Sequence, residues 1–240
     1  MGAYRVGRPV SDLTGNVFLD MQRGVGFHSG EAGAMMQGLG VGEERNTGMG
    51  QETKRPATYE DLVALPEHWV GQIIDGELIA QPRPASGHAR ATSRLGGELY
   101  SPFEKGRGGP GGWSFLDEPE LHFGADVLVP DLAGWRRERM PEVPDTPFFT
   151  LPPDWVCEVL SPSTASLDRS RKRRIYAREG VGHVWLVDPQ ARTLEVFRLS
   201  GGTWVEQGTW TGDERVRAEP FEALELELGV LWLPPEAKAP

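Results

Sequence analysis

The chain has 240 residues, of which 38% are hydrophobic and 25% charged, so it can bury the core of one decorated domain. Its formal net charge of −10 argues against broad non-specific binding to nucleic acid. The one cysteine, Cys157, excludes an intrachain disulfide framework and a cysteine-rich zinc site. We expect no membrane-spanning helix, because no run of about 18 apolar residues occurs. We therefore expect a cytoplasmic protein that does not associate with membranes.

The first fifty residues differ in composition from the rest of the chain. They hold twelve of the 31 glycines and five of the six methionines, without a helical or strand period. Such a segment cannot bury enough apolar surface to fold. We predict a disordered tail over residues 1–55 and a folded domain over residues 56–240. A further hypothesis places the natural start of translation at Met35, Met36 or Met49.

Order is predicted to begin near Thr58, which caps a short helix. Asp75-Gly76 lies between two apolar runs and predicts a β-hairpin. A helix follows from Ser86 to Leu99, although Gly96-Gly97 weakens it. The segment 105–112 is rich in glycine and is expected to form a loop.

Strands dominate the second half of the predicted domain. They are expected at 112–119, 121–123, 125–135, 154–160 and 182–188, followed by a hairpin of 193–199 with 203–210. A capped helix is expected over 167–179, and the segment 221–232 is a candidate edge strand. This order predicts a mixed α/β fold with one central sheet flanked by helices.

Two acids lie in or beside apolar strands, where a carboxylate is costly to bury unless it is paired or binds a cation. Asp131 follows the apolar run VLVP, and its alternative role is a strand-end turn. Glu158 is centred in DWVCEVL, on the face opposite Trp155 and Cys157. Its alternatives are an exposed edge position or a buried salt bridge.

Lys172 is predicted to lie on the helix after the Glu158 strand. Asp168, Lys172 and Tyr176 recur every four residues and so share one helical face. Ile175 lies beside them and favours burial of that face against the strands. The alternative is a solvated basic helix with a weak Asp–Lys pair. Two acids and a lysine suit phosphodiester hydrolysis, because Mg²⁺ takes hard oxygen ligands and a lysine offsets developing charge.

The strings VLVPDLAGW, DWVCEVLSPST, LDRSRKRRIYAREGVGHVWLVDP and TLEVFRL resemble the Uma-type family, described as putative restriction endonucleases, within the PD-(D/E)XK nuclease superfamily. The resemblance covers about residues 58–233. It implies a restriction-endonuclease-like core and a metal-dependent endonuclease acting on DNA, with Mg²⁺ or Mn²⁺ as cofactor and a possible homodimer.

The resemblance also assigns roles to individual residues. Asp131 and Glu158 match the acidic motif positions. Position 160, where the superfamily motif has lysine, is Leu160, and the Uma-type pattern has its lysine at Lys172 instead. The implied metal ligands are Asp131, Glu158 and the backbone carbonyl of Leu160, with Glu77 as a further candidate. Asp168, Tyr176 and His88 are implied as supporting residues.

Nucleic-acid contacts are predicted for a basic run. Residues 169–178 carry six basic side chains and no acid, in contrast to the acidic segment 201–240. Arg169, Arg171 and Arg173 are the candidates for contact with phosphates. The alternative is a solvated helix face.

Two other functions stay open. Two carboxylates alone would also allow a glycosidase, although the nearby lysine and the scattered tryptophans disfavour it. A nuclease fold that has lost catalysis and serves as a binding or interaction module is the second alternative. The sequence holds no HExxH motif and no phosphate-binding glycine loop followed by Gly-Lys-Ser/Thr, so a zinc protease and a nucleotidase are poorly supported.

Overall fold

A six-stranded mixed sheet forms the centre of the fold in the computed structural model, which describes residues 55–82 and 85–234. The predicted tail, apart from residue 55, and the alternative start sites lie outside the described residues. The strands are β1 (Trp69–Ile74), β2 (Glu77–Pro82), β3 (Trp113–Asp117), β4 (Leu121–Phe123), β5 (Asp126–Leu128), β6 (Leu132–Arg136), β7 (Trp155–Val159), β8 (His183–Asp188), β9 (Thr193–Ser200), β10 (Thr203–Thr211), β11 (Arg215–Val216) and β12 (Leu226–Glu227).

The helical segments occupy four parts of the described chain. They are α1 (Tyr59–Val63), α2 (Ser86–Leu99) with the π-helical η1 (Tyr100–Glu104), then α3 (Ala165–Leu167), the π-helical η2 (Asp168–Lys172) and α4 (Arg173–Arg178), and the 3₁₀ segment η3 (Leu228–Leu231). The segments α3, η2 and α4 follow one another without a break. The helix at Ser86–Leu99 has the predicted bounds, and α1 follows Thr58 through a capping box with Asp61.

The strand order in the main sheet is β10-β9-β8-β7-β6-β3. Only β7 and β8 are parallel, and the run α3–η2–α4 supplies the crossover that a parallel pair needs. The other neighbours are antiparallel. This arrangement confirms the predicted mixed fold class with a central sheet flanked by helices.

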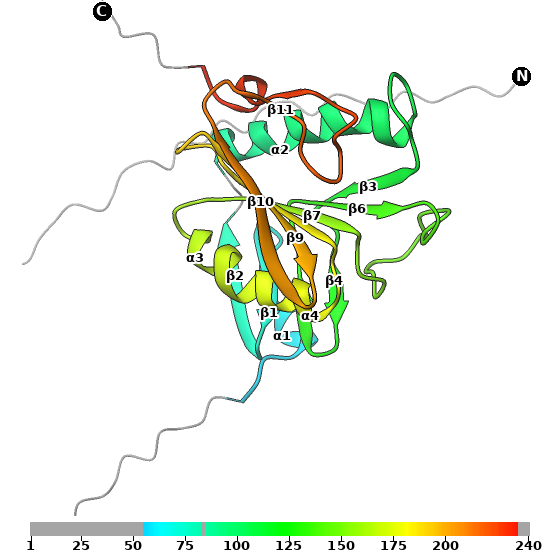
Figure 1. Ribbon diagram of the computed structural model, residues 1–240. Coiled ribbons are helices and arrows are strands. Elements are labelled where there is room, and N and C mark those ends of the chain that lie inside the picture. The colour runs from blue at the N-terminus through cyan, green and yellow to red at the C-terminus, as the bar shows by residue number, and fades with distance from the viewer. Residues whose placement is uncertain (1–54, 83–84, 235–240) are drawn as a thin grey trace, which may run out of the picture. The chain divides into compact units, whose positions relative to one another are not determined.

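Alternation along β7 separates two hydrophobic cores. Trp155, Cys157 and Val159 pack with α2, whereas Val156 and Leu160 pack with Ile175 and Tyr176 of α4. Figure 1 accordingly shows α2 on one side of the sheet and α3–α4 on the other. Glu158 therefore faces the α3–η2–α4 side, as its place in the strand period predicts.

A second sheet has the order β2-β1-β5-β4 and is antiparallel throughout. The predicted hairpin turn joins β1 to β2, with Asp75 at φ 55° and Gly76 at φ 77°. Such positive values at both central residues are those of a tight hairpin turn, which explains the Asp-Gly pair.

The continuous strand predicted over 125–135 was wrong, because β5 and β6 belong to different sheets. The chain leaves the four-stranded sheet after Leu128 and enters the six-stranded sheet at Leu132, so Asp131 lies in the junction. Pro130 has no N–H to give to a strand ladder, and it interrupts the run at this point.

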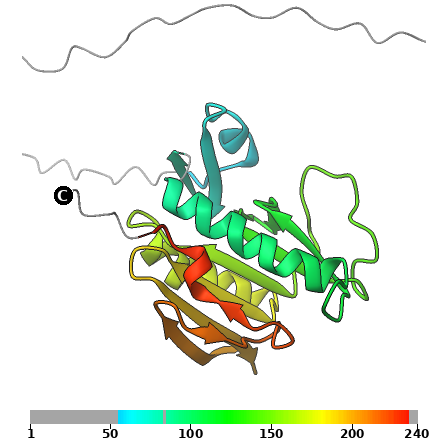
Figure 2. The same ribbon diagram turned by 90° about the horizontal axis from the view of Figure 1, so that it is seen from above.

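The C-terminal segment does not extend the main sheet. Leu226 and Glu227 pair instead with Arg215 and Val216 in a small sheet of their own. The following η3 packs against α2, where Figure 2 shows it in red. No helix in the described ranges is long and apolar enough to cross a membrane.

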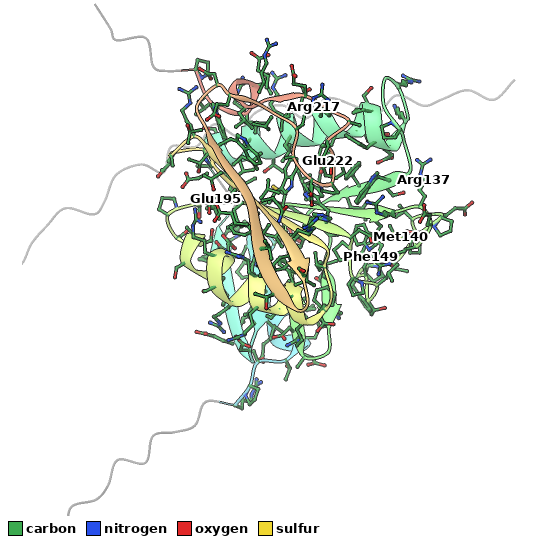
Figure 3. All side chains as sticks on the ribbon, viewed as in Figure 1. Arg137, Met140, Phe149, Glu195, Arg217 and Glu222 are labelled. Carbon is green, nitrogen blue, oxygen red and sulfur yellow. The ribbon has the colours of Figure 1, made fainter. Side chains whose placement is uncertain are left out.

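The connector between β6 and β7 is held to the sheet by two apolar side chains. Met140 and Phe149, labelled in Figure 3, belong to the core on the α4 side. Trp135 donates its indole N–H to the carbonyl of Leu151 at 3.0 Å in the same region. These contacts fix the start of β7, the strand that carries Glu158.

Candidate active site

Glu158 is almost completely buried, at 2% exposure, and both of its carboxylate oxygens accept a hydrogen bond. Lys172 donates from Nζ to Oε2 at 2.8 Å, and Tyr176 donates from its hydroxyl to Oε1 at 2.6 Å. Both donors come from the helical run that crosses from β7 to β8. Spacing of four residues on that run puts both on the side that faces the strand.

Asp168 is the second carboxylate beside Lys172. Its Oδ1 lies 3.1 Å from Lys172 Nζ, without the geometry of a hydrogen bond, and it has no other hydrogen-bond partner among the described residues. Both residues are 2% exposed and lie in the π-helical segment η2. Single π-helical turns inside α-helices frequently occur at functional sites.

Asp131 lies at the junction of the two sheets and is linked to β7 and α2. Its Oδ2 accepts the N–H of Val159 at 2.6 Å, which ties the junction to the residue after Glu158. Its Oδ1 lies 3.1 Å from Nε2 of His88. The predicted strand-end acid therefore joins three elements that are distant in the sequence.

A cavity of about 300 Å³ brings these groups together, and we call it the carboxylate cavity. Asp131, Glu158, Asp168, Lys172 and His88 all line it. It lies where the chain leaves the carboxyl end of β7, since Ser161 and Thr164 line it too. In open sheets with parallel strands, this end is where ligands bind.

The charges in this cavity perturb one another. Burial raises the pKa of Glu158 to about 8, although the Lys172 charge opposes the shift. Burial alone would lower the pKa of Lys172, but Glu158 and Asp168 outweigh it and raise that pKa. Burial and Glu158 together raise the pKa of the Tyr176 hydroxyl well above its usual value. Lys172 and Tyr176 thus stay protonated and act as donors.

The pKa of His88 also reflects a balance between burial and a neighbouring carboxylate. Burial on its own lowers the pKa of His88, but the hydrogen bond and charge of Asp131 outweigh that effect and raise it. The other ring nitrogen, Nδ1, is buried and has no partner among the described residues.

Four carboxyl residues, Glu118, Asp131, Glu158 and Asp168, line this cavity against Lys172 and His88, so acidic groups are in excess. No three His, Cys, Asp or Glu side chains in the described ranges are placed to hold a metal ion by themselves. Mg²⁺ requires less, because it binds through one or two carboxylates, waters and substrate phosphate. Asp131 and Glu158 supply that donor set, and Asp168 adds a third carboxylate beside Lys172. The residues therefore fit a hard divalent cation.

Other predicted site residues lie outside the carboxylate cavity. Leu160 is buried and does not line it, whereas its neighbours Val159 and Ser161 do. Glu77 is 63% exposed beside the hairpin turn, and its Oε2 accepts a hydrogen bond from Arg171 at 2.8 Å. The roles of Leu160 and Glu77 as metal ligands stay predictions.

The basic run makes contacts within the protein. Arg169 forms two hydrogen bonds to Glu195 of β9, the residue labelled in Figure 3, at 2.6 and 2.5 Å. Arg171 binds Asp75, Glu77 and the carbonyl of Ile74. The guanidinium of Arg173 lies 3.8 Å from the ring centre of Phe197, and Arg174 and Arg178 pair with Asp75 and Asp126. Contact of Arg169, Arg171 and Arg173 with nucleic acid stays a prediction.

Two residues of the cavity were missed by the sequence reasoning. Gln72 lies in the apolar run WVGQII, is 2% exposed and accepts the N–H of Val129 at 3.0 Å. A polar residue inside an apolar strand was the available signal, as it was for Glu158. Glu118 adopts a left-handed backbone with φ 47°, which nothing in the sequence indicates. Both line the cavity.

The family model Uma2, described as putative restriction endonuclease, matches residues 57–230. This chain belongs to the Uma2 family. The match spans both sheets and every residue of the carboxylate cavity named above, which confirms the family resemblance.

A solved structure supports the same assignment. The chain is similar to the crystal structure of a putative nuclease belonging to DUF820 from Anabaena variabilis, with a TM-score of 0.58 and 25% identity. The similarity covers 73% of this chain and 97% of the other. Among the curated proteins, no match to this Uma2 chain was found.

Proposed function

We propose that this Uma2 protein is a metal-dependent endonuclease of the PD-(D/E)XK type that hydrolyses phosphodiester bonds in DNA. The observation that carries the proposal is the meeting of Asp131, Glu158 and Lys172 on one cavity, although they come from a sheet junction, a strand and a helix. The family and the DUF820 structure, both described as putative nucleases, support the same reaction class.

In this proposal Asp131 and Glu158 hold Mg²⁺, and Mn²⁺ can replace it. When bound, the ion supplies Lewis-acid polarisation of the phosphoryl group and a more acidic water. Asp131 is oriented for this task by the Val159 N–H and His88. Glu158 is oriented by Lys172 and Tyr176.

Lys172 offsets negative charge in this mechanism and does not accept a proton. Its raised pKa keeps the ammonium charged, so it is a poor base and a good electrostatic partner for phosphate oxygens. Asp168, 3.1 Å away, holds the ammonium in the cavity. The helical position of the lysine, in place of the strand position occupied by Leu160, is compatible with this role.

The test is cleavage of supercoiled plasmid and single-stranded DNA in Mg²⁺, Mn²⁺ or EDTA. Wild type should cleave with either ion and not in EDTA. Glu158→Gln and Asp131→Asn should each lower the rate by about 100-fold or more, the loss typical of removing one essential electrostatic group. Glu142→Gln is the matched control, because Glu142 is exposed and lies outside the cavity.

A second candidate is a nuclease fold that binds a partner without cleaving it. It is favoured by the two hydrogen bonds that already occupy both oxygens of Glu158. Wild type that cleaves no nucleic acid beyond the level of the two variants would contradict the nuclease proposal. Retained binding of Mn²⁺ or DNA in that case would support the binding module.

A further inference from the structure

A larger pocket adjoins the carboxylate cavity along α2 and β3. It has a volume of about 620 Å³, within the range of small-molecule sites, and we call it the α2–β3 pocket. His88 and Glu118 line both spaces, so the two adjoin at these side chains. Nothing in the proposed hydrolysis uses this second space.

Two adjacent glycines inside α2 line the α2–β3 pocket. Gly96 and Gly97 each cost a helix interior about 1 kcal/mol relative to alanine. Packing within the described chain does not require them. A Cβ at Gly97 would meet no atom within 4 Å, and one at Gly96 would make only ordinary contacts with Leu132 and Asp117 at 3.6 and 3.8 Å. The missing side chains therefore leave space beside the helix that a ligand can fill.

Apolar and aromatic side chains line much of the pocket. Phe115 and Leu132 line it together with Tyr100, which is 41% exposed. Trp155 also lines it but is 0% exposed, and neither its indole N–H nor the buried Nδ1 of His88 has a partner among the described residues. Aromatic rings in the lining suit stacking with a heteroaromatic ring.

The charge of the lining argues against phosphate as the occupant. Asp117 and Glu118 line the pocket, and His88 is its only basic side chain in the described ranges. Carboxylates accept hydrogen bonds from the amino groups of a base or the hydroxyls of a sugar, and they repel phosphate. The phosphate of the same nucleotide would lie instead toward Lys172 in the adjoining cavity.

We propose that the α2–β3 pocket binds the base of an unpaired nucleotide whose phosphate lies in the carboxylate cavity. The inference rests on the proposed nuclease function and narrows its substrate to single-stranded or locally unpaired nucleic acid. A base inside a duplex shows only its edges, and its flat faces become accessible when it leaves the stack.

The first test is binding in EDTA, where cleavage plays no part. Fluorescence anisotropy compares the full chain on a labelled single-stranded oligodeoxynucleotide and on the same sequence as a blunt duplex. Wild type should prefer the single strand. Gly97→Leu, which fills the pocket, should weaken that binding by about tenfold or more, as expected for the loss of one base-stacking contact.

Glu98→Leu is the matched control, because Glu98 is exposed on α2 and lies outside the pocket. It removes a negative charge, so electrostatics alone cannot weaken its binding to DNA. Its affinity should be at least that of wild type. Thermal unfolding of both variants verifies that each is folded.

A spectroscopic readout locates the base. The indole N–H resonance of Trp155, assigned with Trp155→Phe, should shift when the single strand is added, and the shift should be absent in Gly97→Leu. Equal affinity of Gly97→Leu and wild type, or preference for the duplex, would overturn the pocket assignment. If the protein still cleaves DNA in spite of such a binding result, only the pocket assignment is wrong. If the base binds as expected but no DNA is cleaved, only the nuclease proposal is wrong.

Discussion

Lys172 Nζ lies 2.8 Å from Oε2 of Glu158, and both side chains are excluded from water. The charge of each is compensated chiefly by the other, with Tyr176 and Asp168 as the remaining neighbours. This ion pair links the helix after β7 to the strand itself, so it has consequences for stability as well as for chemistry.

The first prediction concerns the cost of breaking this pair. At pH 9, above the pKa of Glu158, Lys172→Met should destabilise the protein by about 3–5 kcal/mol, because it leaves the Glu158 carboxylate buried without its cation. The double variant Lys172→Met/Glu158→Gln should be more stable than the sum of the single changes implies. Urea unfolding of the four proteins measures the coupling, and additive single effects would contradict a direct interaction.

The second prediction concerns pH. The folded-state pKa of Glu158 is about 8, against 4.5 for an ordinary glutamate, so the folded protein holds this proton more tightly than the unfolded chain. Its contribution to stability is therefore fully present below pH 4.5 and lost as the pH rises toward 8. In EDTA, the free energy of unfolding should fall between pH 5 and pH 8 by a few kcal/mol more in wild type than in Glu158→Gln. Equal pH profiles would contradict the raised pKa.

The third prediction concerns the Tyr176 hydroxyl. Tyr176→Phe should lower the free energy of unfolding by about 1–3 kcal/mol, because it leaves Oε1 of Glu158 buried without its donor. Tyr59→Phe is its control, since the Tyr59 hydroxyl makes a similar 2.9 Å bond to Glu120 at the surface. That change should cost less than about 0.5 kcal/mol. Similar losses in the two variants would show that burial at Glu158 confers no extra strength.

The fourth prediction concerns metal binding without turnover. Isothermal titration with Mn²⁺ should detect a site in wild type and in Glu142→Gln. Asp131→Asn and Glu158→Gln should each weaken it by about tenfold or more, at least as much as loss of an outer-shell partner does. Unchanged affinity in both variants would place the metal elsewhere.

The fifth prediction separates the fold from the α2–β3 pocket. Gly97→Ala should stabilise the protein by about 0.4–1 kcal/mol, because alanine favours the helix and its Cβ meets no atom within 4 Å. Chemical denaturation measures the change against wild type. A destabilised variant would show that packing within the protein requires Gly97. That result would contradict the inference that the glycine leaves space for a ligand.

The sequence patterns that gave correct predictions were local ones. The alternation in DWVCEVL correctly placed Glu158 opposite Trp155, and the Asp75-Gly76 pair correctly predicted the hairpin. The spacing of Asp168, Lys172 and Tyr176 correctly predicted a shared face. Each of these inferences depends on the repeat of one strand or helix, which a short stretch of sequence contains in full.

Contacts between distant segments could not be predicted from the sequence in this way. The junction after Leu128 places Asp131 between two sheets, and its partners are His88 of α2 and the Val159 backbone. No spacing in the sequence encodes which strands will pair or which loop will meet them, because those choices minimise exposed apolar surface over the whole chain. For the same reason, the positions of Gln72 and Glu118 in the cavity could not be predicted, because they line it only once the sheets have packed together.

By itself, the sequence determined the family, the mixed α/β class and the side of the strand on which Glu158 lies. Only the tertiary structure decided that Lys172 and Tyr176 close on both oxygens of that carboxylate, that Arg169 and Arg171 pair within the protein, and that a second pocket adjoins the first. The physical reason is that local hydrogen bonding and side-chain period are properties of short segments. Burial, charge compensation and cavities exist only between segments that packing brings together.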